Sequence, residues 1–400
     1  MKSLISLFFV VLFCASRHCH AEELSLEKID QGVTNHQFEG VHDFSEDLAA
    51  VRIGNKYGYI DKHGRVAISP QFDDSHDFSE GLALVKISRR YGFIDKKARM
   101  VFVPQFIAAH NFSDGFAAII MSDNQDRKGF IDKKGRIVIN KQFGASPDFS
   151  NTMTKVDIGE FSAGKFCFID RKGTFLSIPQ FDVAENFSEG LAAVRSGDER
   201  TGKFGFINSD GKMVTGFQFD AAHRFSEGMA AVRFGDEHSG KWGVIDRNGR
   251  LIINPIFDDV SIFSEGLASA KSGNQYFFIN KQGKRVFSPT FNAAGIFSEG
   301  LAAVKIGNKF GFIDQDGQMR TDWLFDEAGN FSEGLALVRI GNQYGFINRQ
   351  GEMVIKPQFS GARAFSEGLA AVMIIEENKQ VYGFVDKQGK LVISLKPDEQ

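Results

Sequence analysis

Residues 37–70 read QFEGVHDFSEDLAAVRIGNKYGYIDKHGRVAISP, and this stretch decides the fold because the chain repeats it. A period of roughly 20–50 residues is typical of solenoids and propellers. The sequence therefore predicts a tandem repeat protein. Its Phe-Ser-Glu-Gly-Leu-Ala-Ala-Val step, with variants, recurs ten times at spacings of 34 to 38 residues, beginning at Phe44, Phe78, Phe112, Phe149, Phe187, Phe225, Phe263, Phe297, Phe331 and Phe365.

Each unit has the pattern of a three-stranded antiparallel meander followed by an irregular link. An Asp that bonds its own following backbone, with a Gly three residues later, is a turn signal, as at Asp61 and Gly64. This turn recurs in nine of the ten units, and Ala98 replaces the glycine in the second. The strand-like segments of the first unit are residues 48–53, 57–60 and 65–69.

The third strand indicates how units meet. Residues 137–139, 251–253 and 391–393 are apolar at consecutive positions, which predicts burial on both faces and therefore stacking of neighbouring units. We expect an all-β array of about ten meanders stacked into an open, curved superhelix, because neither terminus holds back a strand to complete the other. A closed, β-propeller-like toroid is the alternative, because stacked meanders resemble blades; against it, propellers typically have about four to eight four-stranded blades, whereas this chain has ten shorter units.

Phenylalanine supplies 42 of the 400 residues, and the repeats explain this excess. The Phe-Ser-Glu-Gly step and a Pro-Gln-Phe-Asp step each contribute one phenylalanine per unit. Side chains at fixed repeat positions are typical of a continuous core. We therefore predict that the core contains Phe44, Phe78, Phe187, Phe225, Phe297, Phe331 and Phe365.

The N-terminus has the pattern of a secretory signal. A single Lys2 precedes a short apolar run, which is about half of the roughly 20 residues needed to span a bilayer. We expect cleavage between Ala21 and Glu22, a secreted or periplasmic location, and no transmembrane segment after signal removal. The predicted domains are the signal at 1–21, a linker at 22–35, the repeat array at 36–396 and a tail at 397–400.

Charge argues against one class of partner, and cysteine content argues against a disulfide. Removal of Lys2 and Arg17 leaves 45 basic and 50 acidic residues, a net charge of −5 spread along the chain. This balance argues against nucleic acid as a partner. Only Cys167 of the three cysteines follows the predicted cleavage site, so we expect no internal disulfide.

A second recurring step carries a family resemblance. It runs aromatic-Gly-aromatic-Ile-Asp, first at residues 57–61 and last at 382–386, in register with the other two steps. The chain therefore resembles the bacterial WG-repeat (KWG) family from Gln37 to Ile393, although the tryptophan of this step remains only at Trp242. The resemblance implies a comparison with cell-wall-binding repeats, which is an analogy and not evidence of function.

Catalysis has little support in the sequence, and we expect neither an enzyme nor a cofactor. The glutamates and serines of the Phe-Ser-Glu-Gly step recur in almost every unit, as at Ser79 and Glu80, whereas an enzyme needs one asymmetric constellation. We interpret the serines as turn hydroxyls that bond nearby backbone, and the glutamates as turn caps on a solvated edge.

Three histidines are the candidate site residues. His42, His76 and His110 lie two residues before the Phe-Ser-Glu-Gly phenylalanine of consecutive units, so stacking could align them in one column. A metal site would want more ligands at closer spacing than one per unit. Two interpretations of these histidines remain: they line a groove for a polar ligand or partner, or they lie in an ordinary solvated loop. We predict no metal site.

The fourth unit, around residues 143–179, is degenerate. Thr152, Thr154 and Lys155 replace small residues of the usual step, so we predict a weak joint that proteases cut first between about 151 and 165. For the whole chain the favoured function is a binding module for an extended envelope or extracellular ligand, either a cell-envelope polysaccharide or a protein. A structural scaffold for a partner protein is the alternative, an enzyme is a distant third, and the sequence leaves the oligomeric state open.

Overall fold

The computed structural model describes residues 38–121, 127–140, 153–157, 165–178, 180–322, 324–376 and 379–393. Every regular element among them is a β-strand, and the strands form small antiparallel sheets that follow one another along the chain. Within these ranges no helix is long and apolar enough to cross a membrane. The predicted all-β array of meanders is confirmed.

The first blade shows the plan of the repeat. It contains β1 (Phe38–Val41), β2 (Leu48–Ile53), β3 (Lys56–Asp61) and β4 (Val66–Phe72), hydrogen-bonded in that order. The strand β1 lies in the segment that the sequence analysis took for an irregular link. Such a blade is therefore a meander of three strands with a short extra strand in front.

The other blades follow this plan with local variation. The ten-residue β8 is shared, since it pairs with β7 in the second blade and with β9 in the third. The remaining strands are β5 (Asp74–Ser75), β6 (Leu82–Ile87), β7 (Arg90–Asp95), β8 (Met100–Ala109), β9 (Phe116–Met121), β10 (Arg127–Asp132), β11 (Ile137–Asn140), β12 (Met153–Asp157), β13 (Phe166–Asp170), β14 (Val183–Ala184), β15 (Leu191–Ser196), β16 (Lys203–Asn208), β17 (Ala221–Ala222), β18 (Met229–Phe234), β19 (Lys241–Asp246), β20 (Leu251–Phe257), β21 (Asp259–Val260), β22 (Leu267–Ser272), β23 (Gln275–Asn280), β24 (Ala293–Ala294), β25 (Leu301–Ile306), β26 (Lys309–Asp314), β27 (Glu327–Ser332), β28 (Leu335–Ile340), β29 (Gln343–Asn348), β30 (Met353–Phe359), β31 (Gly361–Ala362), β32 (Leu369–Glu376), β33 (Lys379–Asp386) and β34 (Leu391–Ile393).

Two turn types set the shape of each blade. Between β3 and β4, Asp61 Oδ1 accepts the backbone N–H groups of His63 and Arg65, and Gly64 takes a φ of 76°. Between the first two strands, the Glu and Gly of the Phe-Ser-Glu-Gly step both have positive φ, 55° at Glu80 and 85° at Gly81. Positive φ at both central residues is the signature of a tight type I′ hairpin turn.

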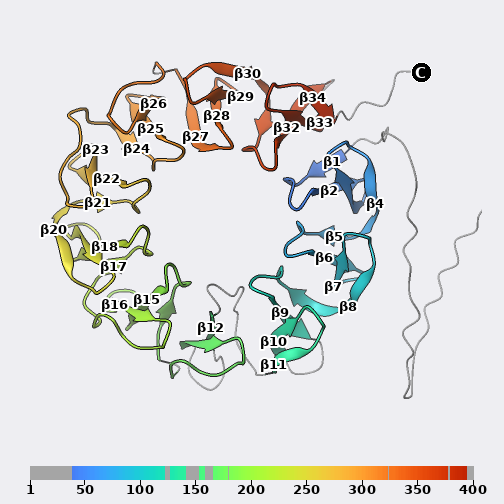
Figure 1. Cartoon of the computed structure of the whole chain (residues 1–400), viewed down its shortest axis with the longest axis horizontal. Coiled ribbons are helices and arrows are strands. Elements are labelled where there is room, and N and C mark those ends of the chain that lie inside the picture. Colours follow the sequence, from blue (N-terminus) through green and yellow to red (C-terminus); the bar gives the residue numbers. More distant parts are fainter. Residues whose placement is uncertain are drawn as a thin grey trace, which may run out of the picture.

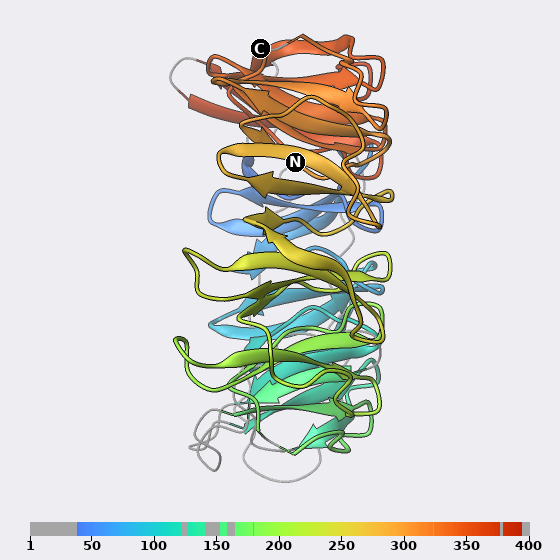
Figure 2. The ribbon, with the colours of Figure 1, turned by 90° about the vertical axis from the view of Figure 1, so that its left-hand side faces the viewer.

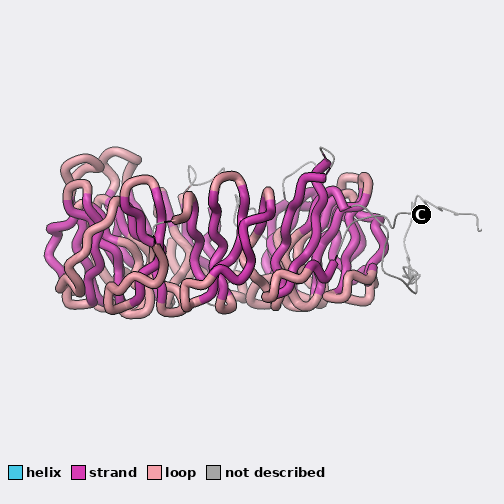
Figure 3. Tube along the Cα trace, turned by 90° about the horizontal axis from the view of Figure 1, so that it is seen from above, coloured by secondary structure: helices cyan, strands magenta, loops and turns pink. Residues whose placement is uncertain are grey.

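The blades are arranged in a ring (Figure 1). Within a blade the first strand lies on the inside of the ring and the last on the outside, as β5 and β8 or β27 and β30 show. Seen from the side, the ring is a flat disc of blades stacked face to face (Figure 2), and the strands run roughly along its axis (Figure 3). This is the architecture of a β-propeller with ten blades.

The ring is closed, so the expectation of an open superhelix is wrong and the toroid alternative holds. Phe38, Phe44 and Ile60 of the first blade pack in one buried cluster with Phe384 and Ile393 of the last. The chain needs no exchanged strand for this, because the tenth blade meets the first with the same kind of packing that joins its neighbours.

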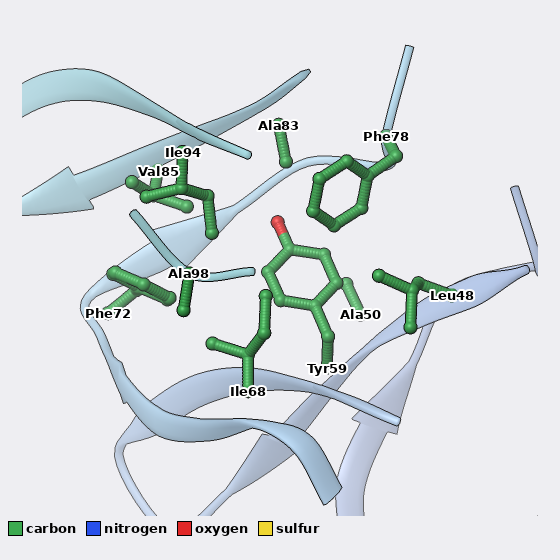
Figure 4. Packing of buried hydrophobic residues seen from close by; sticks show 10 residues of the cluster. All are labelled: Leu48, Ala50, Tyr59, Ile68, Phe72, Phe78, Ala83, Val85, Ile94 and Ala98. Carbon is green, nitrogen blue, oxygen red and sulfur yellow. The ribbon is translucent and has the colours of Figure 1, made fainter. Parts of the chain in front are cut away.

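The core lies between blades. One cluster joins Leu48, Ala50, Tyr59 and Ile68 of the first blade to the second blade, with Tyr59 at its centre (Figure 4). Aromatic rings meet edge to face across such junctions, at 4.9 Å between the centroids of Tyr59 and Phe78. The seven phenylalanines proposed as core residues are all at most 4% exposed: Phe44, Phe78, Phe187, Phe225, Phe297, Phe331 and Phe365.

The outer strands are not buried on both faces, which corrects the sequence interpretation. In β20, Leu251 and Ile252 are each 43% exposed while Ile253 is buried. In β34, Leu391 and Val392 are likewise exposed beside a buried Ile393. These strands lie at the outside of the ring, so only one of their faces can meet a neighbouring blade.

Parts of the sequence predictions lie outside the described residues. These include the signal and its cleavage site at Ala21 and Glu22, the linker, the tail and most of the predicted weak joint. Of the fourth unit, Thr154 is buried in β12, and Lys155 Nζ donates to the carbonyl of Ala184 in the next blade at 2.8 Å.

Candidate functional site

The recurring serines connect blades, which identifies their role as structural. Ser79 Oγ donates to the carbonyl of Phe112 in the next blade at 2.7 Å, and Ser298 Oγ to that of Phe331 at 2.8 Å. At the closing junction Ser366 Oγ donates to the carbonyl of Phe44 at 3.0 Å. The partner is the backbone of the next blade and not nearby backbone, as the sequence analysis had it.

The recurring glutamates also connect neighbouring blades, through their carboxylate groups. The Glu80 carboxylate accepts the backbone N–H of Gly115 in the next blade at 2.9 Å and faces Lys133 Nζ at 2.9 Å. At the closing junction Glu367 accepts the N–H groups of Glu46 and Asp47 at 2.6 and 2.8 Å. These bonds explain why a glutamate tolerates positive φ in a turn that favours Gly, Asn or Asp.

The pKa values of several of these glutamates respond to the bonds. Partial burial raises the pKa of Glu367, but hydrogen bonds from the Asp47 N–H, Lys62 and the Glu46 N–H outweigh it and lower the net value. Glu333 has the same balance, with burial opposed by Gly368 and Lys387. The fold therefore favours the ionised form of Glu333 and Glu367.

Two positions per blade remain without such a structural assignment. They are the residues two and one before the Phe-Ser-Glu-Gly phenylalanine, and we call them rim residues. They follow the innermost strand in most described blades and lie within it, in β27, in the ninth. The recurring phenylalanines, serines and glutamates form columns of equivalent residues around the ring. Unlike these columns, the rim residues change from blade to blade. The described pairs are His42 and Asp43, His76 and Asp77, His110 and Asn111, Glu185 and Asn186, His223 and Arg224, Ser261 and Ile262, Gly295 and Ile296, Gly329 and Asn330, and Arg363 and Ala364.

The rim residues of the first three blades form a polar group that we call the histidine arc. It consists of His42, Asp43, His76, Asp77, His110 and Asn111. His42 Nδ1 lies 2.9 Å from Asp77 Oδ1 of the next blade, with the two side chains 35% and 42% exposed. Ring closure extends the arc, because Arg363 of the tenth blade lies 3.5 Å from Asp43.

His76 lies between the other two predicted histidines and is influenced electrostatically by both of them. Burial lowers the pKa of His76, Asp74 and Asp77 oppose this, and His42 and His110 on either side reinforce it. Burial also raises the pKa of Asp43, against the attraction of Arg363. The three histidines occupy equivalent backbone positions, since their N–H groups donate to the carbonyls of Ala50, Leu84 and Ala118 in consecutive blades.

An aromatic ring and a cation stand behind the rim in most blades. The imidazole of His42 meets Tyr57 edge to face at 6.2 Å, and that of His76 meets Tyr91 at 6.5 Å. Lys86 Nζ lies 5.0 Å from the Tyr91 ring centre. The sequence analysis did not single out this cation, although it recurs eight residues after the Phe-Ser-Glu-Gly phenylalanine.

The sixth blade repeats this arrangement with different side chains. His223 stacks on Trp242, with ring centroids 4.7 Å apart and planes 11° apart, and Arg233 lies 5.9 Å from the same indole. Burial lowers the pKa of His223, while Asp259 of the next blade opposes it. Here the rim histidine is turned onto its aromatic neighbour.

In the described ranges, no group of three or more His, Cys, Asp or Glu side chains could hold a metal ion. Cys167 is buried. What the arc offers is a row of hydrogen-bonding groups on an accessible inner edge, which suits binding.

Comparison with known families identifies the repeat. The model of the "WG containing repeat" matches residues 33–57, 57–88, 91–124, 129–154, 168–199, 204–237, 242–276, 276–310, 310–344, 344–374 and 382–396. The chain belongs to the WG-repeat family. The match is cut at the aromatic-Gly step, so the ten blades of this WG-repeat protein give nine inner segments and two terminal ones.

Other comparisons add little. A search of curated proteins finds no match. Among solved structures, a eukaryotic initiation factor is similar at 11% identity and a TM-score of 0.44, covering 89% of this chain and 94% of that one. The tricorn protease (11%, TM-score 0.24, covering 89% and 44%) is also similar, as is the extracellular domain of a putative one-component system from B. thetaiotaomicron (8%, 0.27, 94% and 68%). At these scores the likeness carries no argument about function.

Proposed function

We propose that this WG-repeat protein is exported and is a ring-shaped binding module for an extended envelope or extracellular ligand. The ligand contacts the histidine arc on the inside of the ring. One observation carries the proposal: the recurring positions are occupied by bonds between blades, whereas the rim residues vary and gather polar groups on consecutive blades.

The geometry supports an extended ligand over a compact one. Stacked sheets pack about 10 Å apart, so equivalent rim residues recur at roughly that interval along the arc. A ligand that spans several blades makes a contact with each of them, but it loses its translational and rotational entropy only once. The apolar N-terminal segment and the predicted cleavage after Ala21 support export.

A pull-down tests the binding function. The purified protein is incubated with peptidoglycan and with envelope extract, beside a His42→Ala, His76→Ala, His110→Ala triple variant. The matched control is Ser261→Ala with Asn330→Ala, which changes rim residues of other blades. We expect the triple variant alone to lose the captured ligand; equal capture by all three proteins contradicts the proposal.

Export has its own test. Mass spectrometry of the protein from its native host should find an N-terminus at Glu22 in the periplasmic or extracellular fraction. An intact Met1 terminus in the cytoplasmic fraction contradicts export.

The scaffold alternative has one observation in its favour. Large apolar side chains are exposed on outer strands, with Val103 at 55% and Ile256 at 61%. Exposed apolar groups of this kind mark protein contacts when they cluster. A partner captured through these residues, and unaffected by the triple variant, would favour the scaffold.

A further inference from the structure

Resting on the proposed binding function, we infer that the ligand of the histidine arc is an uncharged, polyhydroxylated chain, that is, a polysaccharide. The inference comes from an inventory of hydrogen-bonding groups. In the described blades the recurring serines and glutamates bond to the next blade, as at Ser79 and Glu80. At the arc several polar groups have no partner among the described residues.

Two acceptors and two imidazoles of the arc lack partners among the described residues. Asp43 Oδ1 and the side-chain oxygen of Asn111 are buried and accept no hydrogen bond. The imidazole rings of His76 and His110 make none either; only the backbone of these residues is bonded, as where the His76 carbonyl accepts from Tyr59 Oη at 2.7 Å and the His76 N–H donates to the carbonyl of Leu84 at 2.9 Å. Because buried polar groups are nearly always satisfied in native proteins, the two buried oxygens call for a ligand or water, and the accessible imidazoles beside them can bond the same ligand.

The charges around the arc exclude strongly charged ligands. An anion would approach the carboxylates of Asp43 and Asp77, which are 40% and 42% exposed. A cation would meet Arg363, 54% exposed, and Lys86 behind the rim. Opposite charges are thus interleaved, so neither sign of ligand gains a net attraction.

A hydroxyl group fits the free positions. It donates one hydrogen bond and accepts two, so it can serve the acceptors Asp43 and Asn111 as well as a neutral imidazole in either role. Tyr57 and Tyr91 stand beside the histidines as half-buried rings, against which the C–H face of a sugar can pack.

Repetition points to a chain and not to a single sugar. The same rim positions carry these groups on three consecutive blades, which are neighbours in the ring. A peptide is disfavoured, because peptide recognition relies on buried aromatic and aliphatic anchors. The rim residues of the arc are imidazoles, carboxylates and an amide.

The test treats two portions of the envelope extract with reagents that destroy either sugars or proteins. One portion is oxidised with periodate, which cleaves vicinal diols of sugars, and another is digested with protease. We measure carbohydrate retained per mole of the immobilised protein. Periodate should reduce retention at least about tenfold, and protease should leave it unchanged.

A variant ties the retained carbohydrate to the arc. His76→Ala with His110→Ala should lower retention about tenfold, which corresponds to about 1.4 kcal/mol. Asn330→Ala, the matched rim change in the ninth blade, should not. Circular dichroism with thermal unfolding confirms that both variants are folded.

The outcomes separate this inference from the function on which it rests. Capture that depends on the histidines but is lost with protease and survives periodate overturns the polysaccharide and leaves the binding module standing. Equal retention by the two variants, or no capture that depends on the histidines, overturns both.

Discussion

Blades one to three and blades seven to nine share one backbone plan and differ at the rim. Both regions have the buried phenylalanine, the serine bond and the glutamate bond to the next blade. At the rim the first region has His76 and Asp77 where the second has Gly295 and Ile296. Rim side chains can therefore change from blade to blade while the recurring residues that hold the ring together stay the same.

The comparison separates stability from binding. If it is correct, changes in the columns should cost the same in either region, and changes at the rim should cost almost nothing.

Acid should have the largest effect, because it removes many bonds between blades at once. The pKa values of Glu227, Glu299, Glu333 and Glu367 lie below the ordinary glutamate value of 4.5: burial raises them, but hydrogen bonds from backbone N–H groups and cationic side chains outweigh burial and lower the net value. A lowered carboxyl pKa contributes stability that is present above the unfolded value and lost as the pH falls through the folded one. The melting temperature should therefore hold from pH 7 to about 5 and fall steeply below 4.5. A melting temperature that stays level to pH 3 contradicts this.

Truncation of a core phenylalanine comes next. Phe78→Ala in the first region and Phe297→Ala in the second each remove a ring that is at most 2% exposed. Each should lower the free energy of unfolding by about 3–5 kcal/mol, as for other buried aromatic truncations. Urea denaturation measures both, and a clear difference between them would break the equivalence of the regions.

A glutamate of the closing junction should cost less. Glu367→Ala leaves the N–H groups of Glu46 and Asp47 without their acceptor, which should cost about 1–3 kcal/mol. Glu333→Ala is the matched change at an inner junction, where Gly368 loses its acceptor. The two losses should agree; no loss at Glu367 alone would mean that the closing junction is not formed in solution.

Rim and turn residues should have the smallest effect. His110→Ala removes an exposed side chain of the arc, and Lys387→Ala removes one partner of an exposed ion pair with Glu333 at 3.2 Å. Each should change the free energy of unfolding by no more than about 0.5 kcal/mol. A loss above about 1 kcal/mol at His110 would give the rim a structural role and weaken its assignment to binding.

The sequence was sufficient for the local structure. The Asp-x-x-Gly turn and the Leu-Ala-Ala-Val strand are local signals, and Asp61, Gly64 and β2 lie where the pattern placed them. The equivalent backbone positions of His42, His76 and His110 also followed, because repeats in register give equivalent residues the same backbone bonds.

Contacts between blades were beyond the sequence pattern. A serine that bonds the next residue's backbone and one that bonds the next blade look alike in sequence, as Ser79 shows. Ring closure depends on a small rotation per blade that no local signal reports. The apolar run at 251–253 was read as burial on both faces, but at the outside of a ring half of it faces solvent.

The most direct test of the account is whether the tenth blade meets the first as every other blade meets its neighbour. Lys62 Nζ lies 3.1 Å from Glu367 across the closing junction, and Lys281 Nζ lies 3.3 Å from Glu227 across an inner one. A zero-length carbodiimide cross-link should join both pairs in the isolated monomer, with similar yields by mass spectrometry. A cross-link between Lys281 and Glu227 without one between Lys62 and Glu367 would contradict the closed ring.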